Sequence, residues 1–263
     1  MSILMGKPLT RGWRWALVSF TTATALLTGA CARVTGLITQ YEYDETVDLS
    51  LDGSATVYVN GSIPALVALH GVDFDVDPLA RFNRAAIRRL YTAPGVMVRQ
   101  LTTSRRNGRR FVHITLDVDD VQKLSALGPL SWSRYRLNRA NGEYVFTQTI
   151  QGSAQRAVPG VEWTGRELVA FRLHLPSRVL FHNASTDNLK RGNIVVWEQP
   201  FADRLAGAPT RFETRMETQS ILFHTLLLFS LTFLAAVATL AVIVWLVVRQ
   251  GRVATVANGS QRA

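Results

Sequence analysis

Apolar and polar residues alternate along most of residues 38–219, and this alternation predicts β-strands joined by tight turns. Three pairs of alternating runs occupy residues 38–60, 96–118 and 132–150. Each pair is interrupted by a turn dipeptide, in order Asp52-Gly53, Asn107-Gly108 and Asn141-Gly142. These dipeptides accept positive φ angles, which makes them strong hairpin signals between alternating runs. We therefore predict three antiparallel hairpins.

The period changes between the first two hairpins, where residues 79–91 predict the main helix of the domain. Asp77 offers an N-cap and Pro78 a first-turn residue. The helix is predicted to be amphipathic, with an apolar stripe and an opposing basic stripe. The apolar stripe consists of Leu79, Phe82, Ala86 and Leu90, and the basic stripe of Arg81, Arg84 and Arg88.

The rest of the domain completes an α+β pattern. A short second helix is expected over 121–127, and further strands over 167–176, 177–183, 193–201 and 210–219. The loop at 152–165 is a candidate point of subdivision. The predicted fold class is α+β, with hairpin-rich antiparallel sheets, two helices and a C-terminal membrane helix.

The hydrophobic pattern becomes continuous at residues 220–248. From Leu226 to Val248 no residue is charged, and neither Gly nor Pro occurs. A helix over this run would be about 34 Å long, against a hydrocarbon core of about 30 Å. Core helices of soluble domains are shorter and carry one polar face. The run therefore predicts a single transmembrane helix, followed by a basic tail at 249–263.

The N-terminal segment has the pattern of a secretory signal over residues 1–32. A basic stretch precedes an apolar run from Trp15 to Leu27, which is too short to span a bilayer comfortably. The single cysteine, Cys31, follows Thr28-Gly29-Ala30 in a lipobox-like stretch. We favour lipidation of Cys31, and the alternative is cleavage after Ala32. One cysteine excludes an internal disulfide framework and a cysteine-based zinc site.

The formal net charge of +10 is largely a topology signal. Six cations and no acid lie in the flanks outside the two apolar segments, and basic flanks stay in the cytoplasm. We expect residues 33–219 to form an exported domain and the C-terminus to be cytoplasmic, with the protein at the cell membrane. Because the domain is exported, nucleic acid is not an expected partner.

Charge is strongly segregated within the exported domain. Residues 34–80 contain eight acids and no Lys or Arg, whereas residues 81–116 contain nine arginines and no acid. The two runs either neutralise each other as surface salt bridges, or the basic run binds anionic head groups. The candidate residues for an anionic ligand are Arg81, Arg84, Arg88, Arg105, Arg106, Arg109 and Arg110.

Catalytic and metal motifs are absent from the sequence. The run Asp73, Asp75, Asp77 begins like a calcium loop, but Pro78 and Arg84 occupy positions that need Gly and Glu. His113 and Asp117 share one strand face but lie about 13 Å apart, too far for a hydrogen bond. We expect no enzyme activity, no cofactor and no metal site; a hydrolase would need a polar cluster assembled from distant residues.

The order of these features resembles one family. A lipobox-like Cys31, the turn LDGSATVYV, a late Trp strand IVVWE and one C-terminal helix with a basic tail are similar to LppM-type lipoproteins. The resemblance covers residues 31–252. It implies an α+β domain at the cell envelope, proposed in the family to bind phosphatidylinositol-based glycolipids. It implies no catalytic residues.

These observations lead to a functional hypothesis. We expect a membrane-anchored bacterial envelope protein whose exported domain is a non-catalytic module that binds anionic lipid or glycolipid. The alternative is a structural or interaction subunit of an envelope protein complex. A row of small residues on the membrane helix, Thr232, Ala236 and Thr239, is a weak indication of the second function.

Overall fold

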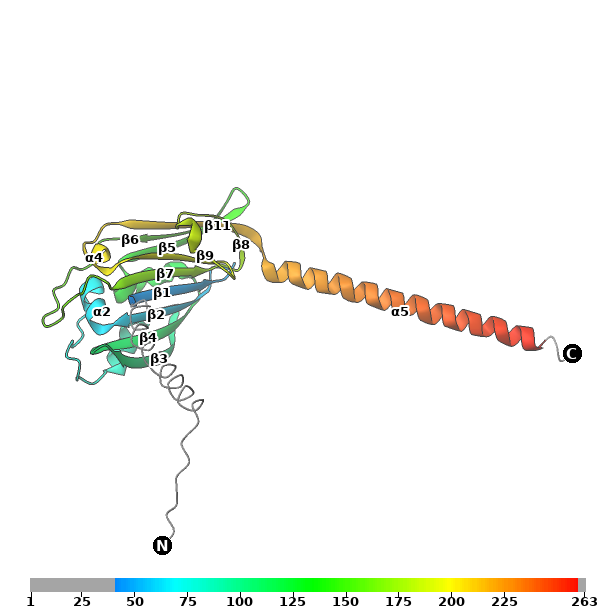
Figure 1. Cartoon of the computed structure of the whole chain (residues 1–263), viewed down its shortest axis with the longest axis horizontal. Coiled ribbons are helices and arrows are strands. Elements are labelled where there is room, and N and C mark those ends of the chain that lie inside the picture. The colour runs from blue at the N-terminus through cyan, green and yellow to red at the C-terminus, as the bar shows by residue number, and fades with distance from the viewer. Residues whose placement is uncertain (1–40, 260–263) are drawn as a thin grey trace, which may run out of the picture. The chain divides into compact units, whose positions relative to one another are not determined.

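The computed structural model describes residues 41–259, with side chains up to Arg249 except Thr186. The expected signal segment and Cys31 lie outside the described residues. Figure 1 shows the order of the elements. They are β1 (Tyr41–Leu49), β2 (Ala55–Ser62), α2 (Ile63–His70), α3 (Arg84–Leu90), β3 (Val96–Arg106), β4 (Arg109–Val118), η2 (Val121–Ala126), η3 (Gly128–Leu130), β5 (Ser133–Ala140), β6 (Glu143–Ile150), β7 (Leu168–His174), β8 (Ser177–His182), η4 (Thr186–Asn188), β9 (Leu189–Lys190), β10 (Ile194–Pro200), α4 (Phe201–Leu205), β11 (Thr210–Ser220) and α5 (Ile221–Gly259).

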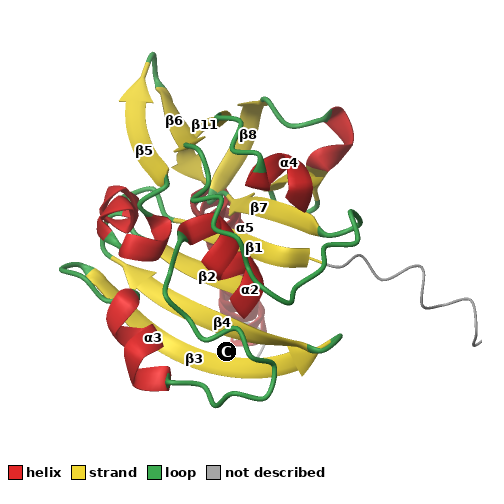
Figure 2. Ribbon diagram, turned by 90° about the vertical axis from the view of Figure 1, so that its left-hand side faces the viewer, coloured by secondary structure: helices red, strands yellow, loops and turns green. Residues whose placement is uncertain are grey.

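The strands form two sheets, which confirms the α+β fold class. The large sheet has the order β3-β4-β2-β1-β7-β10-β9, and the small sheet has the order β5-β6-β11-β8. Every neighbouring pair is antiparallel except β1 and β7, which run parallel. The small sheet and the helices α2 and α3 are visible together in Figure 2.

The core lies between the two sheets and under α2. Tyr43 and Phe171 from the large sheet and Phe146 and Phe212 from the small sheet are all buried. The rings of Phe171 and Phe212 lie 5.1 Å apart, centroid to centroid, so the inner faces of the sheets are in direct contact. Such burial of large apolar side chains is the main favourable contribution to folding.

The predicted hairpins are present, and two of them have the expected turn chemistry. Asn107 and Gly108 have φ angles of 51° and 69°, and Asn141 and Gly142 have φ angles of 53° and 79°. Two successive positive φ angles match the right-handed twist of the flanking strands. These turns fix the registers of β3 with β4 and of β5 with β6.

The main predicted helix is shorter than expected. It begins at Arg84, because Asn83 rather than Asp77 supplies the N-cap: Asn83 Oδ1 accepts a hydrogen bond from Ala86 N at 3.0 Å. Asp77 instead accepts a bond from Leu79 N at 2.8 Å and closes a separate turn. Consequently Leu79 is 82% exposed and is not part of an apolar helix stripe.

Helix α2 was not predicted from the pattern of apolar and polar residues. Ser62 Oγ accepts a hydrogen bond from Ala65 N at 3.1 Å, Pro64 lies in the first turn, and Gly71 ends the helix with a φ angle of 68°. All residues from Ile63 to Leu69 are buried, so this helix has no polar stripe to produce a 3.6-residue pattern.

The last strand continues into α5 without a linker. Ser220 Oγ accepts a hydrogen bond from Phe223 N at 3.2 Å, and Ile221 N donates to Pro176 O at 3.1 Å. Residues Ile221–Arg249 are long and apolar enough to cross a membrane and are not buried by the rest of the protein. The predicted membrane helix is therefore present as a single long helix that is able to span a bilayer.

The pairing of the strands gives the domain two distinct ends. The anchor end contains the turn between β1 and β2, the end of β7 at His174, and Pro176, which bonds Ile221. The tip end contains the Asn107-Gly108 turn, where Arg106 Nη2 donates to Tyr41 O at 3.1 Å. Strand β4 runs from one end to the other, and its eight steps from Arg110 to Val118 cover about 27 Å.

Candidate functional site

An exposed leucine lies next to arginines at the tip end. The turn of Asp77 to Ala80 presents Leu79, and Arg105 Nη2 donates to Leu79 O at 3.4 Å and to Ala80 O at 3.3 Å. Arg81 follows the turn directly, and Arg84 Nη2 reaches Thr103 Oγ1 at 3.4 Å. Thr103 and Arg105 are two residues apart on β3 and so share one face. We call Leu79, Arg81, Arg84 and Arg105 the basic patch.

The cations of the basic patch keep their charge uncompensated by ion pairing. Within residues 41–249, Arg81, Arg84 and Arg105 make no salt bridge, and the printed partners of Arg84 and Arg105 are a hydroxyl and two backbone carbonyls. A carbonyl or hydroxyl oxygen satisfies an N–H group but does not neutralise a guanidinium. The loop also carries Asp75 and Asp77, whose carboxylates accept backbone N–H groups and reduce the net charge nearby.

Two other arginines of the basic run are built into the fold. Arg109 lies 2.7 Å from Glu42 and 3.4 Å from Glu167, donates to Glu162 O at 2.8 Å, and stacks on Trp163.

Arg110 is buried. It donates to Asp75 O and to Ala80 O, and its guanidinium lies 5.0 Å from the centre of the Phe82 ring. Arg109 and Arg110 therefore hold the loops 72–83 and 158–167 against the hairpin.

The seven candidate arginines consequently do not form one site. Arg106 stacks on Phe111 and bonds Tyr41 O, and Arg88 Nη1 donates to Val98 O at 2.7 Å. Of these seven, Arg105 contacts the turn that exposes Leu79, and Arg81 and Arg84 follow that turn in the chain.

Most ion pairs of the acidic run are with cations outside the basic run. Glu42 pairs with Arg109 of the basic run, whereas Asp44 pairs with Arg172 and Asp73 with Arg156. Glu45 is buried and has no cation among its hydrogen-bond partners: it accepts bonds from Tyr43 Oη at 2.8 Å, Tyr135 Oη at 2.7 Å and Gln148 Nε2 at 2.9 Å.

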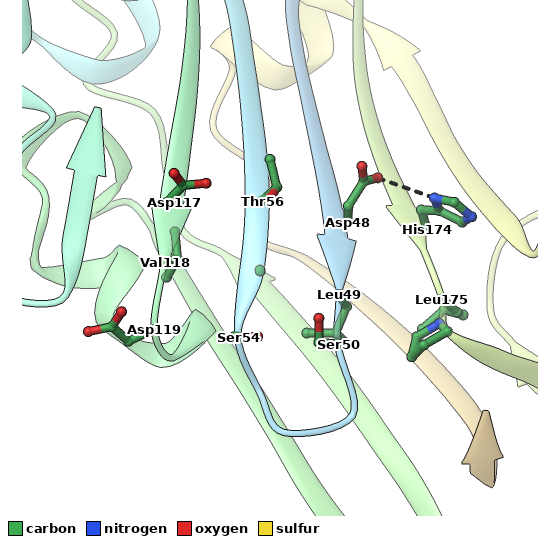
Figure 3. Close-up of a pocket in the computed structure, with 12 residues that line it drawn as sticks. Asp48, Leu49, Ser50, Ser54, Thr56, Asp117, Val118, Asp119, His174 and Leu175 are labelled. Atoms are coloured by element: carbon green, nitrogen blue, oxygen red, sulfur yellow. Dashed lines mark ion pairs between the residues drawn. The ribbon is translucent and has the colours of Figure 1, made fainter. Parts of the chain in front are cut away.

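A pocket of about 570 Å³ lies at the anchor end (Figure 3). Asp48, Asp117 and His174 line it, above the apolar side chains of Leu49 and Val118. Asp48 Oδ1 lies 3.4 Å from His174 Nδ1. The Arg99 guanidinium binds both oxygens of Asp117 at 2.9 Å and lowers the pKa of that carboxyl.

The acids of this pocket do not gather into a metal site. Lys123 Nζ lies 3.7 Å from Asp119 Oδ2, so each carboxylate of the pocket already has a basic neighbour. In the part of the chain that the structure describes, no three His, Cys, Asp or Glu side chains are placed to hold a metal ion. The rim of the pocket is therefore polar, with paired acidic and basic side chains.

A three-residue polar chain crosses the outer face of the large sheet. Ser104 Oγ lies 2.8 Å from His113 Nε2, and His113 Nδ1 lies 3.0 Å from Asn60 Oδ1. Asn60 can only accept at Oδ1, so Nδ1 carries the proton and Nε2 accepts from the Ser104 hydroxyl. Partial burial, and then the charge of Arg106, lower the pKa of the His113 imidazole.

This chain has the order of a nucleophile, a base and an orienting group, but it also has a simpler origin. Asn60 and His113 are directly opposite each other in the pairing of β2 with β4, and Ser104 lies diagonally across on β3. Neighbouring polar side chains on a solvated sheet face hydrogen-bond in this way without catalysis. The sequence pattern related His113 only to Asp117 on the same strand, because Asn60 and Ser104 come from other strands.

Comparisons with known proteins give one distant similarity. No protein-family model matches the chain, and a search of curated proteins gives no match. Among solved structures, the chain is similar to the NMR structure of the folded domain of Mycobacterium tuberculosis LppM, with a TM-score of 0.39 and 9% sequence identity. The similarity covers 68% of this chain and 92% of that domain.

Proposed function

We propose that the protein is a membrane-anchored envelope protein whose exported domain is a non-catalytic binding module. Helix α5 is the anchor, with the domain outside the cytoplasm and the C-terminus inside. The ligand is an anionic lipid or glycolipid, and it binds the basic patch at the tip end. The expected signal segment and a lipidated Cys31 belong to the same proposal.

One observation supports the binding site more than the others. The turn at Leu79 is held in place by Arg105 and by Asp77, and it presents an 82% exposed leucine near arginines that make no salt bridge within the described residues. A single exposed leucine is common on protein surfaces, so the supporting feature is its position next to these arginines. Arginine forks match the geometry of phosphate oxygens, and a leucine beside them suits an acyl or apolar group.

The proposal is tested with the full-length protein in nanodiscs of a zwitterionic lipid, so that α5 is already accommodated. These particles are mixed with vesicles that contain phosphatidylinositol, and co-flotation is measured. The combined variant Arg81→Gln, Arg84→Gln, Arg105→Gln should lose most of the co-flotation. The co-flotation of the wild-type protein should decrease as the salt concentration is raised.

A matched control comes from β5, whose arginines are exposed and lie in the other sheet. The variant Arg134→Gln, Arg136→Gln, Arg139→Gln removes the same charge and should co-float like the wild type. Equal co-flotation of the two triple variants would contradict the basic patch as the lipid site.

A protein partner is the second candidate for the same patch. The patch lies at the far end of the strands from Pro176, where the chain leaves for α5, so a partner that stands away from the bilayer could reach it. A photo-crosslinking residue at Leu79 that captured one defined envelope protein, together with no vesicle binding, would favour this candidate.

The non-catalytic character is also a proposal and has its own test. The Ser104–His113–Asn60 chain is the arrangement that resembles a nucleophilic site. A fluorophosphonate probe reacts with serine that is activated by a base. We expect no labelling, and labelling that disappears in Ser104→Ala and His113→Ala would contradict the proposal.

A further inference from the structure

An edge strand begins at the point where the chain leaves the domain for α5. Strand β8 is the outer strand of the small sheet, next to β11. Its first residue, Ser177, pairs with Ser220, and the preceding Pro176 accepts a hydrogen bond from Ile221 N. The start of β8 is therefore tied to the first residue of α5 through β11 and through Pro176, with no flexible segment between them.

Two large apolar side chains of β8 are turned toward solvent. Leu180 is 46% exposed and Phe181 is 45% exposed. The register of β8 with β11 shifts between the pairs of Phe181 and Val179, which leaves Leu180 as the extra residue of a bulge. A bulge at a sheet edge re-aims its side chains. In this case it places two consecutive apolar residues on the surface.

Arginines flank these apolar side chains. The Arg178 side chain is 75% exposed and its Nη1 lies 3.7 Å from Glu217, while the Arg215 guanidinium stands 5.1 Å from the centre of the Phe181 ring. Aromatic and aliphatic groups bordered by long cationic side chains are typical of surfaces at the boundary between head groups and acyl chains.

The position of Trp245 places the first turn of α5 at the head groups on the domain side. The apolar span Ile221–Arg249 has 29 residues and is about 43 Å long, roughly 13 Å more than the hydrocarbon core. Arg249 lies over the Trp245 ring, a pair that suits the far membrane interface. Counting about 20 residues back from Trp245 leaves Ile221, Leu222 and Phe223 at the head groups on the domain side.

We propose that the β8 edge, Arg178 to Phe181, is a second membrane contact that rests on the same bilayer that α5 spans. This inference depends on the anchor in the proposed function but not on the ligand of the basic patch. The first turn of α5 exposes its own apolar side chains. The hydrogen bond of Ile221 to Pro176 holds the start of β8 next to this turn. Immersion of that turn in the interface brings Leu180 and Phe181 to the lipid.

The test uses full-length protein with Cys31→Ser and one added cysteine that carries an environment-sensitive fluorophore. The protein is reconstituted into phosphatidylcholine vesicles that contain a phospholipid with a nitroxide high on the acyl chain. The three labelled positions are Leu180→Cys in the β8 edge, Phe223→Cys in α5, and Leu79→Cys at the tip end. Leu79 is the matched exposed leucine, and these vesicles carry no anionic lipid for the basic patch.

We expect the nitroxide to quench most of the fluorescence at Phe223→Cys and Leu180→Cys and little at Leu79→Cys. Adding Phe181→Asp should reduce the quenching at Leu180→Cys without changing it at Phe223→Cys. If Phe223→Cys is quenched while Leu180→Cys matches Leu79→Cys, the β8 contact is refuted and the anchor stands.

Two other outcomes would also overturn the inference. If Phe223→Cys is not quenched, α5 is not in the bilayer and the anchor fails together with the β8 contact. If fluorophores at Leu180→Cys quench one another as the protein-to-lipid ratio rises, and the nitroxide has no effect, then the free edge of β8 pairs with a second copy of the chain.

Discussion

Arg105 and Arg109 lie at the same hairpin tip, but the fold uses their charges in opposite ways. Arg109 faces Glu42 and Glu167 at the edge of the core. Arg105 holds a turn through two backbone carbonyls and remains on the surface. Both belong to one run of arginines without an acid, so their sequence context is the same. The comparison indicates that the interior arginine serves stability, whereas the surface arginine is free to serve binding.

The largest expected effect comes from removing the interior arginine. Arg109→Met leaves Glu42, which is fully buried, without the cation 2.7 Å away. Removing one partner of a buried ion pair typically costs about 3–5 kcal/mol. Urea unfolding of the full-length protein in detergent micelles should show a loss of this size. Arg81→Met is the control, and a comparable loss there would remove the distinction between the two kinds of arginine.

A partly buried histidine extends the comparison to a group that makes no ion pair within the described residues. His70 donates to Pro129 O, its ring lies 4.4 Å from that of Trp132, and burial lowers its pKa to about 4. The unfolded chain binds the proton at about pH 6.5, so the stability linked to His70 is complete above that pH and declines as the pH falls toward 4. The decline should be about 3 kcal/mol.

This prediction is measured as a difference in slope. Urea unfolding between pH 7 and pH 4 should show a smaller acid loss for His70→Gln than for the wild type, whatever the cost of the substitution at pH 7. Parallel pH profiles would mean that His70 takes up its proton in the folded state as easily as in the unfolded chain.

The stability linked to Glu45 should depend on pH with the opposite sign from that linked to His70. Burial raises the pKa of its carboxyl, although Tyr135, Tyr43 and Gln148 donate to it. A raised carboxyl pKa favours folding below the unfolded pKa of about 4.3, and this contribution is lost as the pH rises through the folded pKa. The unfolding free energy of Glu45→Gln minus that of the wild type should therefore increase from pH 4 to pH 8. A difference that falls over this range would show that the three donors outweigh burial.

Local signals in the sequence predicted the hairpins and the membrane helix but not the way the sheets assemble. Asn107-Gly108 specifies its own turn, because both residues tolerate positive φ. The parallel pairing of β1 with β7 joins strands more than 100 residues apart and depends on the whole core, for which no local pattern exists. Helix α2 lacked periodicity, although Ser62, Pro64 and Gly71 are recognisable end signals.

The sequence predicted that the candidate site consists of arginines, but not which of the arginines belong to it. The charge pattern identified the arginines, and the structure then separated them by their distance from the core. Arg109 and Arg110 adjoin Gly108, yet the strand pairing directs them toward Glu42 and the loop 72–83. The exposure of Leu79 depends on whether Asp77 or Asn83 caps α3, and both residues are good caps in sequence.

The smallest expected effect on stability comes from substitutions in the basic patch. These substitutions are also the most specific test of the difference between surface and interior arginines. Surface substitutions away from caps and buried networks usually change stability by less than about 0.5 kcal/mol. The variant Arg81→Gln, Arg84→Gln, Arg105→Gln should therefore unfold at nearly the same urea concentration as the wild type while it loses vesicle binding. Arg105 also bonds the carbonyls of Leu79 and Ala80, so a loss above 1 kcal/mol, reproduced by Arg105→Gln alone, would assign this arginine to the scaffold together with Arg109. Reduced vesicle binding would then follow from a displaced Leu79 turn rather than from lost charge, and Arg81→Gln, Arg84→Gln without Arg105→Gln would separate the two causes.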